Sequence, residues 1–252
     1  MRKIRTTCWM SLGAAVAVAL VSALPAAGQV TVYENDFEGS GPVGPEWSDA
    51  STDVTPGTTS HPADTFLGQF GNQTVTLTLD MPAGHTQVTV ACDLYVIRSW
   101  DGNFDGDYRG PDFWAVAEGP VPAEPDDWDY ITTFNNWDPT VCTQAFPDAY
   151  GYGTHPARTG ADENDTLGYL FYQDGWFILD SVYALSVDLP HTAEALTFSF
   201  GAANLQELSD ESWGLDNVVV TVDVPEPASA TLLVLGIVGL VARRRARHQG
   251  LR

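Results

Sequence analysis

Alternation of apolar and polar residues is the feature that most constrains the fold of this chain. The longest run holds one apolar phase over five positions: Val88, Val90, Cys92, Leu94 and Val96. A period of two places such side chains on one face of a β-strand, whereas a helix repeats at spacings of three and four. The same alternation recurs in residues 75–79, 183–189, 196–200 and 218–222. The sequence therefore predicts an all-β protein.

Turn residues separate these segments, as in the Asp-Met-Pro-Ala-Gly stretch at residues 80–84. Short strands split by turns indicate an antiparallel β-sandwich, a jelly roll of the concanavalin A-like or galactose-binding-like kind. Thr74, Thr76 and Thr78 form a row of the type that can match ice. An ice-binding face needs such rows on several strands, so we interpret this one as the solvent side of an ordinary strand.

The N-terminal residues 1–28 have the anatomy of a secretory signal peptide. Arg2, Lys3 and Arg5 form a basic head, and an apolar run over residues 12–24 precedes small residues. We expect a signal helix and cleavage after Gly28. An uncleaved anchor is the alternative, although the apolar run is short for a membrane span.

The C-terminal residues 224–252 combine a proline-rich start, an apolar stretch at 228–242 and a basic cluster at 243–247. The arginines should stay on the cytoplasmic side, which places the preceding domain outside. This tail resembles the PEP-CTERM sorting signal of bacteria, whose hydrophobic helix holds the protein in the membrane before processing. The resemblance implies an exosortase-type membrane protease as partner; a plain membrane anchor is the alternative. The residues that carry it are Pro225, Glu226, Pro227, Arg243, Arg244 and Arg245.

The residues between these ends are strongly acidic. All 33 Asp and Glu fall in residues 34–226, together with three arginines, so this stretch has a formal charge of −30. Such a field repels nucleic acid and anionic lipid and attracts cations. A solvated surface adapted to salty surroundings would have the same composition, so charge alone does not predict calcium binding.

Two cysteines, Cys92 and Cys142, remain after removal of the signal peptide. Because exported proteins meet an oxidising compartment, we expect a disulfide bond between them. It would close a loop of about 50 residues and stabilise the fold by about 4 kcal/mol in the chain-entropy model. Two buried thiols are the alternative.

Residues 101–112 match the calcium-loop pattern of EF-hands, with Asp in place of the final Glu as in dockerin-type loops. Ca²⁺ takes about six to eight oxygen ligands, and alternate positions of a tight loop bring carboxylates to one side. Strand-like residues flank this loop, where an EF-hand has helices. We expect a calcium loop between strands, with a flexible acidic hairpin as the alternative. The expected ligands are Asp101, Asn103, Asp105, Asp112 and the carbonyl of Asp107.

Short motifs near both ends of the expected ectodomain, residues 29–223, resemble MAM-type and related lectin-like jelly rolls. They are Asn-Asp-Phe-Glu at residues 35–38 and Trp-Gly-Leu-Asp-Asn-Val at residues 213–218. In those families the first and last strands pair, and acids there hold a structural calcium. The resemblance implies Glu38 and Asp216 as ligands; a turn cap is the alternative for Asp216.

Three tryptophans, Trp100, Trp128 and Trp137, lie in loop sequence rich in Asp and Asn, with Tyr150 and Tyr152 nearby in the chain. Flat rings beside polar side chains are typical of sugar sites, since a ring covers the apolar face of a pyranose. For any one of these tryptophans, the alternative is that its ring is buried at an end of the hydrophobic core.

Catalytic motifs for serine hydrolases, zinc proteases and phosphate binding are missing from the sequence. The clustered acids of residues 124–129 leave glycoside hydrolysis as a remote alternative. We expect an exported protein of the cell envelope or extracellular matrix, stabilised by calcium and binding exopolysaccharide. A structural or adhesive surface protein without a small ligand is the alternative function.

Overall fold

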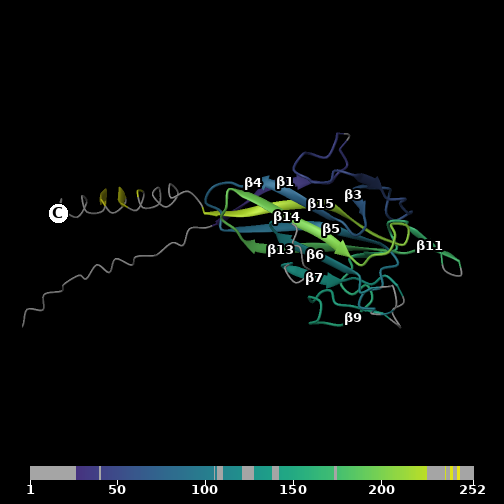
Figure 1. The fold of residues 1–252 in the computed structure, drawn as a ribbon. Helices are drawn as coiled ribbons and strands as arrows, with labels where there is room; N and C mark the ends of the chain where they lie inside the picture. The colour runs from purple at the N-terminus through teal and green to yellow at the C-terminus, as the bar shows by residue number, and fades with distance from the viewer. Residues whose placement is uncertain are drawn as a thin grey trace, which may run out of the picture. The chain divides into compact units, whose positions relative to one another are not determined.

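Two antiparallel sheets form the framework of the described chain (Figure 1). The computed structural model describes residues 27–39, 41–104, 106, 110–120, 128–137, 142–172, 175–225, 236, 239–240 and 243–244. One compact unit spans Ala27–Pro225. The predicted all-β sandwich is confirmed.

The larger sheet contains seven strands in the order β10-β13-β5-β15-β3-β2, with β1 also paired to β15. Along one side of β15, β3 pairs with residues 213–215 and β1 with residues 218–225. The strands are β1 (Ala27–Asn35), β2 (Thr52–Val54), β3 (Thr65–Phe70), β5 (Gln87–Arg98), β10 (Glu163–Asn164), β13 (Asp180–Pro190) and β15 (Glu211–Pro225).

The smaller sheet has the order β4-β14-β6-β7, and two short pairs, β8–β9 and β11–β12, lie outside both sheets. The strands of the smaller sheet are β4 (Thr74–Asp80), β6 (Phe113–Glu118), β7 (Tyr130–Thr133) and β14 (Ala195–Ala203). The short pairs are β8 (Thr143–Gln144) with β9 (His155–Pro156), and β11 (Leu170–Tyr172) with β12 (Trp176–Ile178).

The apolar phases predicted from the sequence form the core between the sheets. One cluster of buried residues combines Val88, Leu94 and Val220 of the larger sheet with Leu77 and Phe198 of the smaller. On the opposite face of β5, Thr89, Ala91 and Asp93 are partly buried, whereas Tyr95 and Ile97 belong to a second buried cluster. The alternation therefore identifies the strand faces that meet between the two sheets.

The two ends of the compact unit lie side by side, because Ala27 pairs with Pro225 and Gly28 with Val224. Pairing thus runs past the ectodomain bounds expected from the sequence, and cleavage after Gly28 stays a prediction. Outside this unit the structure describes five residues of the tail, all helical. The described part of the chain holds no helix with the length and hydropathy needed to cross a membrane. The expected signal helix and most of the helix at 228–242 lie outside the described residues.

Candidate metal centre

Backbone contacts close the loop that follows β5. Asp101 forms an isolated bridge with Asn135, and the Asp112 N–H donates to the Gly102 carbonyl at 3.0 Å. Gly102 has φ +66°, and a Cβ there would lie 2.3 Å from the Thr143 carbonyl oxygen. Only glycine fits that turn without displacing the neighbouring backbone. The first and last residues of the 101–112 loop are thereby brought together.

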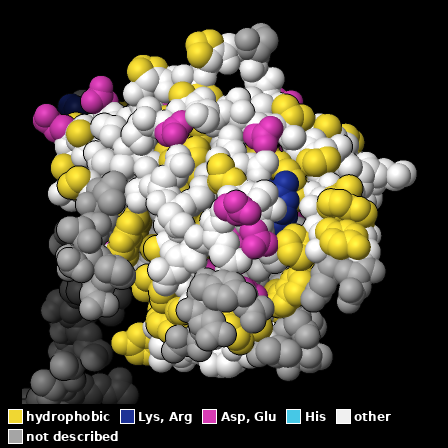
Figure 2. Space-filling view, turned by 45° about the vertical axis from the view of Figure 1, so that its right-hand side comes forward, with side chains coloured by type: hydrophobic (Ala, Val, Ile, Leu, Met, Phe, Trp, Pro, Cys, Tyr) yellow, Lys and Arg dark blue, Asp and Glu magenta, His cyan; other side chains and the backbone are white. Residues whose placement is uncertain are grey.

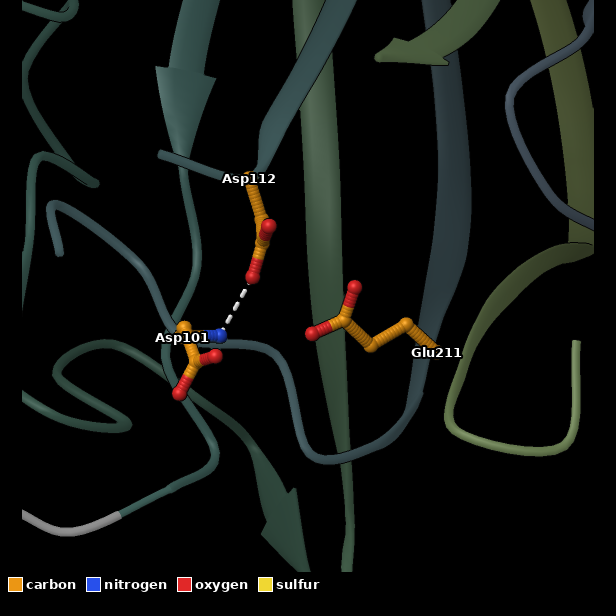
Figure 3. A group of neighbouring side chains, drawn as sticks. All are labelled: Asp101, Asp112 and Glu211. Atoms are coloured by element: carbon orange, nitrogen blue, oxygen red, sulfur yellow. Dashed lines mark hydrogen bonds between the residues drawn. The ribbon is translucent and has the colours of Figure 1, made fainter. Parts of the chain in front are cut away.

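Three acidic side chains converge at this point (Figure 3). Asp101 follows β5, Asp112 precedes β6 and Glu211 opens β15; one carboxylate oxygen from each lies within 4.8 Å of the other two. Glu211 reaches the loop because β15 pairs with β5, where Glu211 stands opposite Arg98. The group therefore joins the loop to the central strand pair.

All three carboxylates are buried, and two of their oxygens lack hydrogen-bond partners among the described residues. Asp112 and Glu211 are 0% exposed and Asp101 is 4% exposed. One Asp112 oxygen accepts the Asp101 N–H, and Glu211 Oε2 accepts the Gln206 N–H at 2.6 Å. Asp112 Oδ1 and Glu211 Oε1 accept no hydrogen bond from another described residue, and a proton shared between these two side chains would join them. An unsatisfied buried carboxylate oxygen is costly unless a proton or a cation supplies the missing interaction.

Burial also shifts the acidity of this group. It raises the pKa of Asp112 to about 7, against the opposing effect of the backbone N–H of Asp101. Burial, and next the charge of Asp112, raise the pKa of Glu211 to about 9. Without a cation the folded protein therefore keeps a proton on this group near neutral pH. Three carboxylates around one point are also the hard oxygen donors that Ca²⁺ prefers, so the residues fit that ion.

The structure brings together two of the predicted loop ligands and adds one that sequence reasoning missed. Asp101 and Asp112 belong to the group, whereas the side-chain oxygen Oδ1 of Asn103 accepts a hydrogen bond from the Thr133 hydroxyl instead. Asp105 and Asp107 lie outside the described residues. A signal for Glu211 was present in the sequence, because it shares the inward phase of Trp213 and Leu215 at the start of a core strand. A charged residue in a buried phase needs a partner.

The other predicted pair, Glu38 and Asp216, is linked through a third acid, Asp64, which interacts with both. The Tyr95 hydroxyl lies 2.9 Å from Asp216 Oδ2 and 3.2 Å from Asp64 Oδ2. A side-chain hydrogen bond with Asp64 raises the pKa of Glu38, and burial raises the pKa of Asp216 to about 7. The expected pairing of first and last strands, β1 with β15, is present. Calcium ligation by Glu38 and Asp216 stays a prediction.

The three tryptophans predicted to bind sugar have different surroundings. Trp100 is 0% exposed in the core cluster, so the prediction that it stacks on a sugar at the surface is wrong. Its loop position turns the ring inward, the alternative that the sequence left open. Trp137 packs on Phe171 with ring centroids 5.3 Å apart, and Trp128 lies against Gly201 of β14.

A cleft of about 400 Å³ opens beside the 101–112 loop and contains both tyrosines noted in the sequence. Tyr152 is 88% exposed, and the Tyr150 ring rests edge-on against Phe113 at 4.8 Å between centroids. Asn103 lines the same cleft. The cleft therefore combines two aromatic side chains with one residue of the 101–112 loop, whose amide group is bonded to Thr133 and Thr143.

The predicted disulfide is not formed, since Cys92 and Cys142 are not bonded to one another. Cys92 points into the core cluster and Cys142 is buried outside it, so their thiols do not meet. Burial raises the pKa of Cys92 to about 12. Of the acids considered for glycoside hydrolysis, Asp129 is described, and its carboxylate accepts the Glu118 N–H at 2.6 Å; residues 124–127 lie outside the described residues.

The profile of the PEP-CTERM protein-sorting motif matches residues 223–245. This confirms the predicted sorting tail. The motif marks an exported protein that an exosortase-type system sorts to the cell envelope. A search of curated proteins found no match.

Solved structures similar to this chain include three cleaved adhesin domains of Lys-gingipain. The K3 domain from Porphyromonas gingivalis W83 has 12% identity and a TM-score of 0.32, covering 76% of this chain and 98% of that one. The K1 domain from the same organism has 14% identity and a TM-score of 0.32, covering 77% and 97%. The K2 domain has 15% identity and a TM-score of 0.30, covering 75% and 96%. Similarity at this level gives no basis for transferring a function.

Proposed function

We propose that the ectodomain is a calcium-stabilised domain of the cell surface or matrix that binds extracellular polysaccharide. One observation carries the metal half of this proposal: Asp112 and Glu211 each present a buried oxygen without a partner among the described residues, and both belong to the three-carboxylate group. Asp101, Asp112 and Glu211 would hold the ion. Bound calcium would neutralise these buried carboxylates, which otherwise stay neutral by keeping protons.

The three-carboxylate group lies at the end of the domain opposite its C-terminal residue, Pro225, because Glu211 stands at the start of β15. Glu211 opens this strand and Pro225 ends it, beside Ala27. At about 3.3 Å per residue, the strand separates the group from the chain ends by roughly 45 Å. A domain held by its C-terminal end would therefore present the carboxylates at its opposite end.

The cleft beside the loop supports the polysaccharide half. Tyr150 and Tyr152 offer rings that can cover a pyranose face, and Asn103 lies in the same cleft. Asn103 belongs to the loop whose ends carry Asp101 and Asp112. An ion that ties these ends together would fix the position of Asn103, so we expect polysaccharide binding to depend on calcium.

Thermal unfolding of the full exported protein tests the metal half. At calcium a thousand-fold above its Kd, the expected stabilisation is about 4 kcal/mol, and the midpoint rises by about 10 °C. Asp112→Asn and Glu211→Gln should abolish this rise, whereas Glu34→Gln, an acid exposed on β1, should keep it. An unchanged midpoint in millimolar calcium and in chelator would refute the metal half.

Affinity electrophoresis in polysaccharide gels, with and without calcium, tests the ligand half. Tyr152→Ala should weaken retardation while leaving the calcium-induced rise in midpoint intact. Calcium-dependent self-association without retardation in any gel would instead favour the structural or adhesive alternative.

A further inference from the structure

The β11–β12 hairpin carries aromatic side chains on both of its faces. Its cross-strand partners are Leu170 with Ile178, Phe171 with Phe177, and Tyr172 with Trp176. Because partners share a face and neighbours alternate, Phe171 and Phe177 occupy one face and the other two pairs occupy the opposite face. We call these the inner and outer faces of the hairpin.

One residue of the inner face, Phe171, packs against the body of the domain, whereas Phe177 is 38% exposed. Phe171 lies 6.1 Å from Phe177 and 5.3 Å from Trp137, centroid to centroid, both in edge-on geometry. Trp137 is itself anchored, because its backbone N–H donates to the Trp100 carbonyl at 3.3 Å. At the base of the hairpin, the Leu179 N–H donates to the Tyr169 carbonyl at 2.9 Å. The hairpin is therefore attached to the domain through the Phe171 ring and the backbone bond at its base.

The outer face has large side chains in solvent. Leu170 is 53% exposed, Tyr172 61% and Trp176 70%. The rings of Tyr172 and Trp176 lie 5.2 Å apart at 58°, so each restricts the other. In Figure 2, hydrophobic side chains gather toward the right of the view, the side to which β11 projects in Figure 1. Contiguous exposed aromatic residues on a soluble domain mark binding surfaces more often than chance placement does.

We propose that the outer face of the β11–β12 hairpin binds an uncharged polysaccharide by stacking of its sugar rings on Trp176 and Tyr172. This inference rests on the proposed function and adds to it a second contact surface and the charge class of the ligand. Two rigid rings bury the apolar faces of successive pyranoses, at low cost in side-chain entropy because the rings already support one another.

The negative charge of the domain favours an uncharged polysaccharide over an acidic one. The stretch of residues 34–226 carries 33 acids and three arginines, which repels acidic polymers. The two arginines that the structure describes there are already engaged. Arg158 pairs with Asp165 through two contacts of 2.8 Å, and Arg98 donates to the Leu208 carbonyl at 3.0 Å. Neither is available to recognise a uronate or sulfate group.

The size of the face argues against a second protein as the occupant. With aromatic side chains of about 150–250 Å² each, the exposed parts of Leu170, Tyr172 and Trp176 amount to roughly 400 Å². A stable protein interface needs about 800 Å² on each partner. The face therefore suits a narrow polymer chain better than a second copy of this protein.

Affinity electrophoresis of the full exported protein tests the proposal with dextran, galactomannan and xyloglucan as uncharged probes and alginate as the acidic probe. Retardation is expected with at least one uncharged probe and not with alginate. Trp176→Ala and Tyr172→Ala should each weaken that affinity about ten-fold, the loss expected for one stacked ring. Val54→Ala, which trims an exposed apolar residue on β2, should leave it unchanged. Trp176→Phe should retain most of the affinity, because a ring remains, and unchanged thermal midpoints would show that the variants fold.

Several results would overturn the proposal. Retention of affinity in both hairpin variants, with loss in Tyr152→Ala, would contradict the hairpin surface while leaving the proposed function intact. Retardation by alginate alone would contradict the charge class. Trp176-dependent dimerisation in sedimentation, or Trp176-dependent binding to phosphatidylcholine vesicles, would identify a different occupant. Absence of retardation by all four probes would remove the polysaccharide half of the proposed function and this inference with it.

Discussion

Asp180 accepts hydrogen bonds from four consecutive backbone amides, those of residues 166–169. Each of its carboxylate oxygens takes two of them, at distances of 2.9–3.1 Å. The side chain is fully buried at the first position of β13. A single residue thus replaces a strand partner for the segment that leads into the β11–β12 hairpin.

Replacing this carboxylate should destabilise the protein strongly. In Asp180→Asn one oxygen is replaced by an amide NH₂ group, which leaves two buried N–H groups without an acceptor and costs about 3 kcal/mol. The thermal midpoint should fall by about 10 °C. Asp188→Asn is the matched control, because Asp188 lies exposed on the same strand and accepts one bond, from Thr89 at 2.6 Å. Equal losses in the two variants would contradict this account of Asp180.

At the level of strands, the central position of β5 and β15 should appear as slow hydrogen exchange. β5 lies between β13 and β15, and β15 has partners on both sides, so neither can open without disrupting the sheet. The β11–β12 pair belongs to neither sheet and should exchange first. Native-state exchange followed by mass spectrometry resolves the three segments; protection of β11–β12 equal to that of β5 would contradict the topology.

Strands with one buried face could be predicted from the sequence, whereas the short β11–β12 hairpin and the inward turn of a loop side chain could not. The phase from Val88 to Val96 identified β5 and its inward face, because alternation records burial directly. The hairpin was not predicted, because residues 170–172 and 176–178 are apolar on both faces and alternation is lost. Trp100 was misjudged for a related reason: a polar loop sequence does not reveal that its ring turns into the core.

The metal centre could be predicted only in part, because a sequence pattern finds ligands that are close along the chain and misses those brought in by strand pairing. Asp101 and Asp112 lie in one loop, so a local spacing pattern finds them. Glu211 is about a hundred residues away in sequence and joins them through the pairing of β15 with β5. A pattern read along the chain carries no information about that contact, although the buried phase of Glu211 marks it as a residue in need of a partner.

For the whole molecule, stability without calcium should fall as pH rises. Unfolded carboxyls titrate at about 4, whereas folded Asp112, Asp216 and Glu211 titrate at about 7, 7 and 9. Between those values the folded state holds more protons than the unfolded state, so each pH unit upward removes stability. The thermal midpoint of calcium-free protein should therefore be higher at pH 5 than at pH 8.

Saturating calcium should flatten this dependence above neutral pH, because the ion replaces protons on the carboxylates of Asp112 and Glu211. Differential scanning calorimetry across pH 5–9, with and without calcium, measures both curves. Coincident curves, or a midpoint that rises with pH in calcium-free protein, would contradict the assigned role of these acids.

The central claim is that Asp101, Asp112 and Glu211 together hold a calcium ion, and anomalous diffraction from a crystal grown in millimolar calcium tests it most directly. The account predicts one strong anomalous peak at the meeting point of the three carboxylates, at about 2.3–2.6 Å from their oxygens. A well-ordered site without a peak, with Asp112 and Glu211 joined by a shared proton, would contradict it.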